Sequence, residues 1–295
     1  MSKISPQLIR FGHSPDPDDA FMFYAFAKNK LDMRGFKVEH VIEDIESLNQ
    51  RALKGELEVT AVSCHAYAYL ADKYAVMRSG ASVGDAYGPI LVRSPELGVR
   101  RKNKNSSLRV AVPGKLTTAY LVLQLYGKLE GCAPNSELRT PYEIIFTPFD
   151  KIFDAVKSGE VDLGLVIHEG QITHSEHGLE KVLDLGTWWH EKTKLPLPLG
   201  IDIIRRDLGP ETMKRFAALF KESIEYALNH RKDALEYASQ FGRGISDDLN
   251  DRFVAMYVND RTVDIGNDGE AGFRALLDQA FAGKIIPEKI KLEFI

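Results

Sequence analysis

The chain has 295 residues, 44% of them hydrophobic and 27% charged, which is ordinary for a globular protein of one large or two medium domains. Its 38 basic and 42 acidic residues give a net charge of -4, without the basic excess that nucleic-acid binding requires. Residues 1–10 lack the apolar run of a secretion signal, and no apolar segment approaches the length of a membrane span. We therefore expect a cytoplasmic protein that has neither nucleic acid nor membrane as a partner.

Short apolar runs alternate with amphipathic segments along most of the chain. They predict strands over residues 8–12, 36–42, 57–63, 89–92, 108–112, 142–147, 161–168 and 201–205. They predict helices over residues 20–27, 47–53, 67–74, 117–126, 150–157 and 210–227, with further helices and a terminal strand or tail at 290–295 after them. This alternation is typical of an α/β protein. The last third contains no evident chemistry, and we expect it to be scaffold packed on the first lobe.

Residues 14–19, Ser-Pro-Asp-Pro-Asp-Asp, follow the first predicted strand. Pro17 suits a first helical turn, and the three acids complement the positive end of the helix dipole. Two interpretations stay open here. The segment only caps the helix, or Ser14 and the adjoining backbone line a pocket.

The chain contains an internal repeat. The same order of strand, turn, helix, strand and helix leads to Gly-Glu-Leu-Glu-Val at 55–59 and to Gly-Glu-Val-Asp-Leu at 159–163. Aligning these pentapeptides places Cys64 opposite His168, and the first turns align with Ser14 opposite Gly114. Two similar α/β lobes predict a bilobed protein with its ligand between them.

His168 ends the predicted strand 161–168 and is followed directly by Glu169 and Gly170. Ligands of parallel α/β sheets bind beyond the carboxyl ends of the strands, so His168 is the leading candidate for a reacting group. One imidazole can act as a general acid or base on a bound organic anion near neutral pH. The alternative is a core or surface histidine that makes a single hydrogen bond. Glu169 either orients the ring or faces solvent.

A carboxylate is best accommodated at Thr117 and Thr118. They open a predicted helix that has no acid in its first turn and that follows Lys115, so its positive dipole end is unshielded. Capping of the helix by Thr117 is compatible with this role.

Other chemistries find no support in the sequence. Gly114-Lys115 is not a phosphate-binding loop, because Arg109 occupies the required first glycine position, and no Gly-x-Ser-x-Gly turn occurs. Cys64 and Cys132 lack a Cys-x-x-Cys partner, and the basic residues around 100–104 are typical of a solvated loop. No metal is expected, because the nearby imidazoles and carboxylates follow no established zinc spacing (His168, His174, His177, Glu169 and Glu176).

Four stretches that span most of the chain carry a resemblance to a known family. They are Ser14-Pro15-x-Pro17-x-Asp19 with Phe21, Arg109-Val-Ala-Val-Pro-Gly114 with Thr117-Thr-Ala-Tyr120, Ile167-His168-Glu169, and Asp184-Leu-Gly-x-Trp-Trp189 running to Leu195-Pro-Leu-Pro-Leu-Gly200. Together they resemble the menaquinone-biosynthesis enzymes of the futalosine route, and within these the 1,4-dihydroxy-6-naphthoate synthases.

The resemblance implies an α/β fold of the two-lobed, periplasmic-binding-protein-like (type II) class, each lobe a mixed sheet flanked by helices. We expect a discontinuous large lobe of residues 1–95 and 199–295 and a small lobe of residues 96–198. The implied reaction converts cyclic dehypoxanthinyl futalosine, a small carboxylate, to 1,4-dihydroxy-6-naphthoate with release of dihydroxyacetone and without a cofactor.

The resemblance also implies roles for particular residues. The family histidine that matches His168 is the proposed base, and the segment Asp16-Pro-Asp18 departs from the more frequent Cys-Pro-Asn of the family. The family threonines that match Thr117 and Thr118, and the family serine that matches Ser63, line the ligand pocket. Three further expected substrate contacts, Ser14, Asp18 and Cys64, come from the first turn and the repeat and not from the resemblance.

Two alternative functions remain. The sister chorismate-dehydrating enzymes share the fold, although Thr-Thr-Ala-Tyr at 117–120 and Ile-His-Glu at 167–169 favour the naphthoate branch. A solute-binding protein for a small organic anion is the other, because this fold mostly serves capture. An imidazole is present at the expected crevice and an export signal is absent, and both observations favour an enzyme. The sequence leaves the oligomeric state open, a homodimer included.

Overall fold

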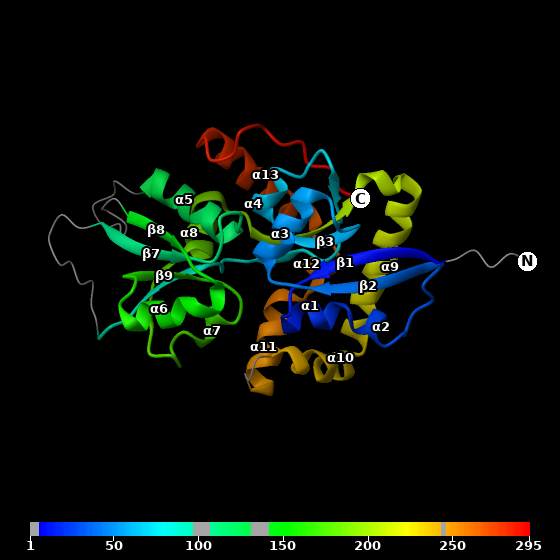
Figure 1. Ribbon diagram of the computed structural model, residues 1–295, viewed down its shortest axis with the longest axis horizontal. Helices are drawn as coiled ribbons and strands as arrows, with labels where there is room; N and C mark the ends of the chain where they lie inside the picture. Colours follow the sequence, from blue (N-terminus) through cyan, green and yellow to red (C-terminus); the bar gives the residue numbers. More distant parts are fainter. Residues whose placement is uncertain (1–5, 97–106, 131–141, 243–245) are drawn as a thin grey trace, which may run out of the picture. The chain divides into compact units, whose positions relative to one another are not determined.

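The computed structural model describes residues 6–96, 107–130, 142–242 and 246–295 (Figure 1). The chain divides into two compact units. Unit 1 comprises residues 1–83, 198–271 and 290–295, and unit 2 comprises residues 84–197 and 272–289. Cys132 and the basic segment around 100–104 lie outside the described residues.

Unit 1 is built on a mixed sheet that has six strands in the described part of the chain. These are β1 (Gln7–His13), β2 (Phe36–Ile42), β3 (Val59–Ser63), β4 (Tyr74–Val76), β5 (Ser82–Gly84) and β11 (Leu197–Arg205). The strand order is β2-β1-β3-β11-β4, with β5 paired to β11. Because β1, β2 and β3 are parallel, the residues that follow β1 and β3 emerge at the same edge of the sheet.

Helices cover this sheet or pack on the helices that do, and with the sheet they form the core of unit 1 (Figure 1). They are α1 (Pro17–Met22), α2 (Tyr24–Ala27), α3 (Ile45–Lys54), α4 (Cys64–Tyr67), α9 (Pro210–Asn229), α10 (Arg231–Ala238), α11 (Asp247–Tyr257), α12 (Asp260–Val263) and the first part of α13 (Gly266–Ala282). Phe11 of β1 packs edge-on against Phe23 at 4.5 Å and against Phe220 of α9 at 4.9 Å between ring centroids. The apolar stripe predicted for α9 is therefore confirmed as the face that covers the sheet.

Unit 2 contains a second mixed sheet, of five strands among the residues described. These are β6 (Ile90–Arg93), β7 (Leu108–Val112), β8 (Tyr142–Phe146), β9 (Leu163–Val166) and β10 (Glu180–Asp184), in the order β10-β6-β9-β7-β8. Its helices are α5 (Thr118–Glu130), α6 (Ile152–Ser158), α7 (Gly170–Thr173), α8 (Leu185–Thr193) and the latter part of α13, and the 3₁₀ turn η1 (Phe149–Lys151) precedes α6. β7, β8 and β9 are parallel, whereas β6 runs antiparallel to β9.

The internal repeat is confirmed by the topology of the two sheets. β1 lies between β2 and β3 in unit 1, and β7 lies in the same way between β8 and β9 in unit 2, with all three strands parallel in each case. The helix before each third strand ends in a left-handed glycine, Gly55 (φ 72°) after α3 and Gly159 (φ 74°) after α6. The two matched pentapeptides thus begin with the glycine that terminates a helix.

The observed division differs in places from the expected one. It falls at 83/84 and 197/198 instead of 95/96 and 198/199, because β6 pairs with β9 and β10 of unit 2. Residues 272–289 also belong to unit 2, so the last third does not pack wholly on the first lobe. The helix predicted over 67–74 is wrong: α4 ends at Tyr67, and Tyr74 starts β4 with its hydroxyl donating to the Leu57 carbonyl at 2.8 Å.

None of the helices within the described ranges combines the length and apolar character needed to cross a membrane.

Candidate functional site

The loop after β1 is held together by its own carboxylates. The Ser14 backbone N–H donates to Asp19 Oδ2 at 2.6 Å, and the Ser14 hydroxyl donates to Asp16 Oδ2 at 2.8 Å. Pro17 occupies the first turn of α1, as predicted, but the side chain of the N-cap residue Asp16 makes no capping hydrogen bond. Asp16 therefore does not cap α1 with its side chain, and Asp16 and Asp19 instead fix the position of Ser14.

Asp18 and Asp202, two buried carboxyl groups, belong to unit 1, as the loop after β1 does. Burial raises the pKa of Asp18 well above its ordinary value, and the neighbouring acids Asp19 and Asp16 raise it further. Burial, with a contribution from Asp19, likewise raises the pKa of Asp202 on β11. Within the described residues, Oδ1 of Asp18 and Oδ1 of Asp202 accept no hydrogen bond. These carboxyls favour the protonated form, in which a carboxyl group can donate a hydrogen bond.

Ser63, at the carboxyl end of β3, is fixed by Asn49 of α3. The Ser63 N–H donates to Asn49 Oδ1 at 2.9 Å, and Asn49 Nδ2 donates to Ser63 Oγ at 3.2 Å. Asn49 is fully buried, and α3 is placed by the Asp44 carboxylate, which caps its first turn. Since Ser63 Oγ accepts from Asn49, its own proton remains for another acceptor. Cys64 follows at the start of α4 and is buried.

A histidine pair lies at the same end of β1. His13 Nδ1 donates to the Ser14 carbonyl at 3.0 Å, so His13 Nε2 is unprotonated and accepts from His40 Nδ1 at 3.1 Å. The His13 ring stacks on Phe23 with centroids 4.2 Å apart. Burial, reinforced by His40, lowers the pKa of His13 to about 3. This pair is therefore neutral and acts as a support of the Ser14 loop.

In unit 2, Thr117 caps α5. Its Oγ1 accepts from the Tyr120 N–H at 3.2 Å and donates to the Gly114 carbonyl at 2.9 Å. Both Thr117 and Thr118 are buried, and the first turn of α5 contains no acid. The predicted capping role of Thr117 is confirmed, and the helix start keeps the unshielded positive end that the sequence predicts.

His168 lies two residues beyond β9, in a left-handed backbone conformation with φ 54°. Its ring contacts Phe149 of η1 with centroids 5.1 Å apart, and its carbonyl accepts from the Gln171 N–H at 3.1 Å. The turn is tight because a Cβ atom on Gly170 would lie 2.4 Å from a methyl group of Val166. β9 is buried along its whole length, as predicted, but it ends at Val166, so His168 lies just beyond the sheet and does not end the strand.

The other two histidines near this strand have structural contacts. His174 Nδ1 donates to the Gln171 carbonyl at 3.0 Å, and the His177 ring packs on Phe153 at 4.8 Å. Among the described residues, no three His, Cys, Asp or Glu side chains are grouped so that they could hold a metal ion.

The parallel strands bring the candidate residues to one edge of each sheet. In unit 1 this edge holds Ser14, which follows β1, and Ser63, the last residue of β3. In unit 2 it holds the residues that follow β7 and β9, including His168. Sequence reasoning did not identify Asn49, His13, His40 or Asp202. Asn49 could have been noticed, because a polar side chain between Leu48 and Ala52 interrupts the buried face of α3.

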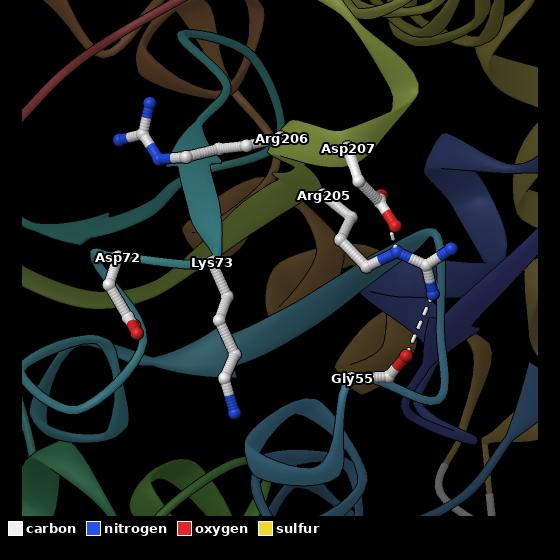
Figure 2. Close-up of a pocket in the computed structure, with 6 residues that line it drawn as sticks. All are labelled: Gly55, Asp72, Lys73, Arg205, Arg206 and Asp207. Carbon is white, nitrogen blue, oxygen red and sulfur yellow. Dashed lines mark hydrogen bonds and ion pairs between the residues drawn. The ribbon is translucent and has the colours of Figure 1, made fainter.

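A separate pocket of about 480 Å³ lies in unit 1, lined by Gly55, Asp72, Lys73, Arg205, Arg206 and Asp207 (Figure 2). Arg205 donates to Asp207 Oδ1 and to the Gly55 carbonyl, both at 2.7 Å, as the dashed lines of Figure 2 show. Arg206 pairs with Glu293 at 2.7 Å, and Lys73 donates to the Leu53 carbonyl at 2.8 Å.

These cations are therefore already neutralised or hydrogen-bonded within the protein. The register of β11 against β3 also places Arg205 beyond Val59, at the opposite sheet edge from Ser63. We do not assign the functional site to this pocket.

The fold and the two sets of strand-end residues define a protein of the periplasmic-binding-protein-like class. An alkanesulfonate-binding protein from Xanthomonas axonopodis pv. citri shares this fold with a TM-score of 0.70 over 97% of this chain and 96% of that chain, at 10% sequence identity. A family model described as "Menaquinone biosynthesis" matches residues 9–282, and the chain belongs to that family.

Relatives within the family are similar over nearly their full length. A 1,4-dihydroxy-6-naphthoate synthase from Thermus thermophilus is 39% identical over 276 residues, which are 94% of this chain and 95% of the relative. A crystal structure of an Archaeoglobus fulgidus protein has a TM-score of 0.84 at 45% identity, covering 95% of this chain and 98% of that chain. A chorismate dehydratase from Thermus thermophilus is 24% identical over 70% of this chain and 74% of its own length. The resemblance found from the sequence is thereby confirmed, as is the fold class.

Proposed function

We propose that this protein is a lyase that forms 1,4-dihydroxy-6-naphthoate in menaquinone biosynthesis. The support is the near full-length similarity to a synthase of that name, which exceeds the similarity to a chorismate dehydratase in both identity and coverage. The proposed substrate is cyclic dehypoxanthinyl futalosine, with dihydroxyacetone as the second product and no cofactor. Aromatisation of the product supplies the driving force, so the protein needs mainly to bind the substrate and remove a proton.

The observation that carries the mechanism is the conformation of His168. A left-handed backbone is unfavourable for a residue with a Cβ atom, and such strain is concentrated at functional sites. The conformation turns the chain out of the sheet at a strand end, where ligands of α/β proteins bind. We assign His168 as the general base, with its ring steadied by Phe149.

The carboxylate of the substrate is proposed to bind at the start of α5. Thr117 already uses its hydroxyl proton on the Gly114 carbonyl and holds the turn. Backbone N–H groups at a helix start have no intrahelical carbonyl acceptor. The Tyr120 N–H already donates to Thr117 Oγ1, so the N–H groups that precede Tyr120 in this turn are the proposed donors for an anion. Thr118 lies in this turn and is proposed as the second threonine contact.

Contacts from unit 1 are proposed from Ser63, Ser14, Asp18 and Cys64. Ser63 keeps a hydroxyl proton to donate to a substrate oxygen, since its Oγ accepts from Asn49. A protonated Asp18 carboxyl can donate to a substrate hydroxyl or carbonyl, and its raised pKa favours that form. A cytoplasmic location and a homodimeric assembly stay predictions.

A substrate panel tests the assignment. The purified protein is incubated separately with cyclic dehypoxanthinyl futalosine and with chorismate, and products are identified by liquid chromatography and mass spectrometry. We expect 1,4-dihydroxy-6-naphthoate and dihydroxyacetone in equal amounts from the first compound and no dehydration of the second. Dehydration of chorismate without conversion of the futalosine derivative would indicate a chorismate dehydratase. Binding without conversion of either compound would indicate a solute-binding protein.

A further inference from the structure

An aromatic side chain lies in contact with solvent beside the start of α5. Phe146 ends β8 and is 52% exposed. It pairs in register with Val112, the last residue of β7, and the next residue, Thr147, donates its N–H to the Val112 carbonyl at 2.9 Å. Val112 lies two residues before Gly114, whose carbonyl holds Thr117. Phe146 is thus connected directly to the turn where we place the substrate carboxylate.

Tyr120 completes this surface from the helix side. Its ring meets the Phe146 ring edge to face, with centroids 5.6 Å apart and planes at 89°. The Tyr120 N–H donates to Thr117 Oγ1, so the capping interaction that forms the helix start also positions the tyrosine. Tyr120 belongs to the first turn of α5 and its ring contacts that of Phe146, so both rings lie near the start of this helix. We call Phe146 and Tyr120 the aromatic shelf.

Exposure alone does not mark a site, because single apolar side chains are common on protein surfaces. Leu129 of α5 and Phe281 of α13 are exposed in unit 2 as well, at 60% and 41%. Phe146 differs from them by its place at the carboxyl end of a parallel strand, beside a helix start without acids. An anion at that start and a flat apolar face beside it match one kind of ligand, an aromatic ring that carries a carboxylate.

We propose that the aromatic shelf binds the ring system of a bicyclic aromatic carboxylate and thereby determines specificity for it. This inference rests on the proposed function, since the matched synthase is named for a naphthoate. Stacked or edge-on contact between the ligand rings and Phe146 supplies affinity that a saturated ring of the same size lacks. The carboxylate meets the first turn of α5 while the rings lie on the shelf.

The test measures binding of two acids by isothermal titration calorimetry, independently of turnover. The probes are 2-naphthoate and its saturated counterpart, decahydro-2-naphthoate, on the wild-type protein and on Phe146→Ala, Phe146→Leu and the matched control Phe281→Ala. We expect tighter binding of 2-naphthoate by the wild type. Phe146→Ala should weaken that binding roughly 3- to 10-fold and leave the saturated acid nearly unchanged, with Phe146→Leu in between and Phe281→Ala like the wild type.

Three results would contradict the proposal that the aromatic shelf binds the ring system. They are unchanged 2-naphthoate affinity in Phe146→Ala, an equal loss for both acids, and an absence of 2-naphthoate binding by the wild type. The expected binding pattern in a protein that does not convert the futalosine derivative would count against the proposed function alone. Conversion of that substrate together with an unchanged affinity in Phe146→Ala would count against the shelf alone.

Discussion

Substitution of His168 by glycine separates the chemistry of its ring from its contribution to stability. The left-handed backbone at φ 54° costs a residue with a Cβ atom about 1 kcal/mol, which glycine does not incur. Loss of the contact between the His168 and Phe149 rings costs about 0.5–1.5 kcal/mol in the opposite direction. The two terms nearly cancel, so the free energy of unfolding should change by less than about 1 kcal/mol.

Activity should respond very differently. A general base contributes a factor of about 10²–10⁴, so kcat/KM of His168→Gly should fall by that factor, equivalent to about 3–5 kcal/mol of transition-state stabilisation. The matched control is Lys194→Gly, because Lys194 is an exposed residue in unit 2 with a similar left-handed backbone, at φ 59° after α8. This control should gain about 1 kcal/mol of stability and keep full activity.

Stability is measured by urea unfolding, monitored by circular dichroism. Activity is measured as the steady-state rate of naphthoate formation. A His168→Gly enzyme that retains activity within about threefold would refute the assignment of His168 as the base. A loss of stability above about 3 kcal/mol would also refute the reasoning, because the backbone and ring terms would then be misjudged.

Three further predictions concern residues that support unit 1. In Asn49→Ala the Ser63 N–H loses its acceptor, so the free energy of unfolding should fall by about 2 kcal/mol. The same variant should raise KM more than it lowers kcat. A stability equal to that of the wild type in thermal unfolding would contradict this prediction. For His13 the folded pKa of about 3 lies below the ordinary value of 6.5, so the unfolded chain binds a proton that the folded chain does not. Stability should therefore fall as pH drops from about 6.5 towards 3, by roughly 2 kcal/mol at pH 5, and His13→Phe should flatten this dependence in urea titrations. For Asp202 the folded pKa is raised, so the folded state is penalised increasingly as pH rises above the ordinary value of 3.8. Asp202→Asn should gain stability over the wild type more at pH 8 than at pH 5, and a constant difference would contradict the raised pKa.

Local patterns in the sequence predicted much of the fold because the parallel strands are short and apolar. Residues 36–42 and 108–112 were bounded correctly, and the repeat placed β3 and β9 in equivalent positions. The limits of the two units were harder to predict, since they depend on the pairing of β6 with strands that lie some 70 to 90 residues later in the chain. That pairing leaves no local trace in the residues of β6.

The same distinction between local and long-range signals applies to the residues of the candidate site. His168 and Thr117 are recognisable because a polar residue follows an apolar strand or opens a helix, which are local signals. Asn49 and His40 act on partners 14 and 27 residues away, and Asp202 is an acid within a strand that otherwise reads as apolar. Their roles depend on which elements become neighbours, so they could be identified only from the folded chain.

The most direct test of the account compares binding and conversion of cyclic dehypoxanthinyl futalosine by the wild type and by His168→Ala. Calorimetry gives the affinity, and liquid chromatography gives the rate of naphthoate formation. We predict that the variant binds the substrate with an affinity close to that of the wild type and converts it at least about 100-fold more slowly. Conversion at the wild-type rate by His168→Ala would contradict the central claim that this imidazole removes the proton.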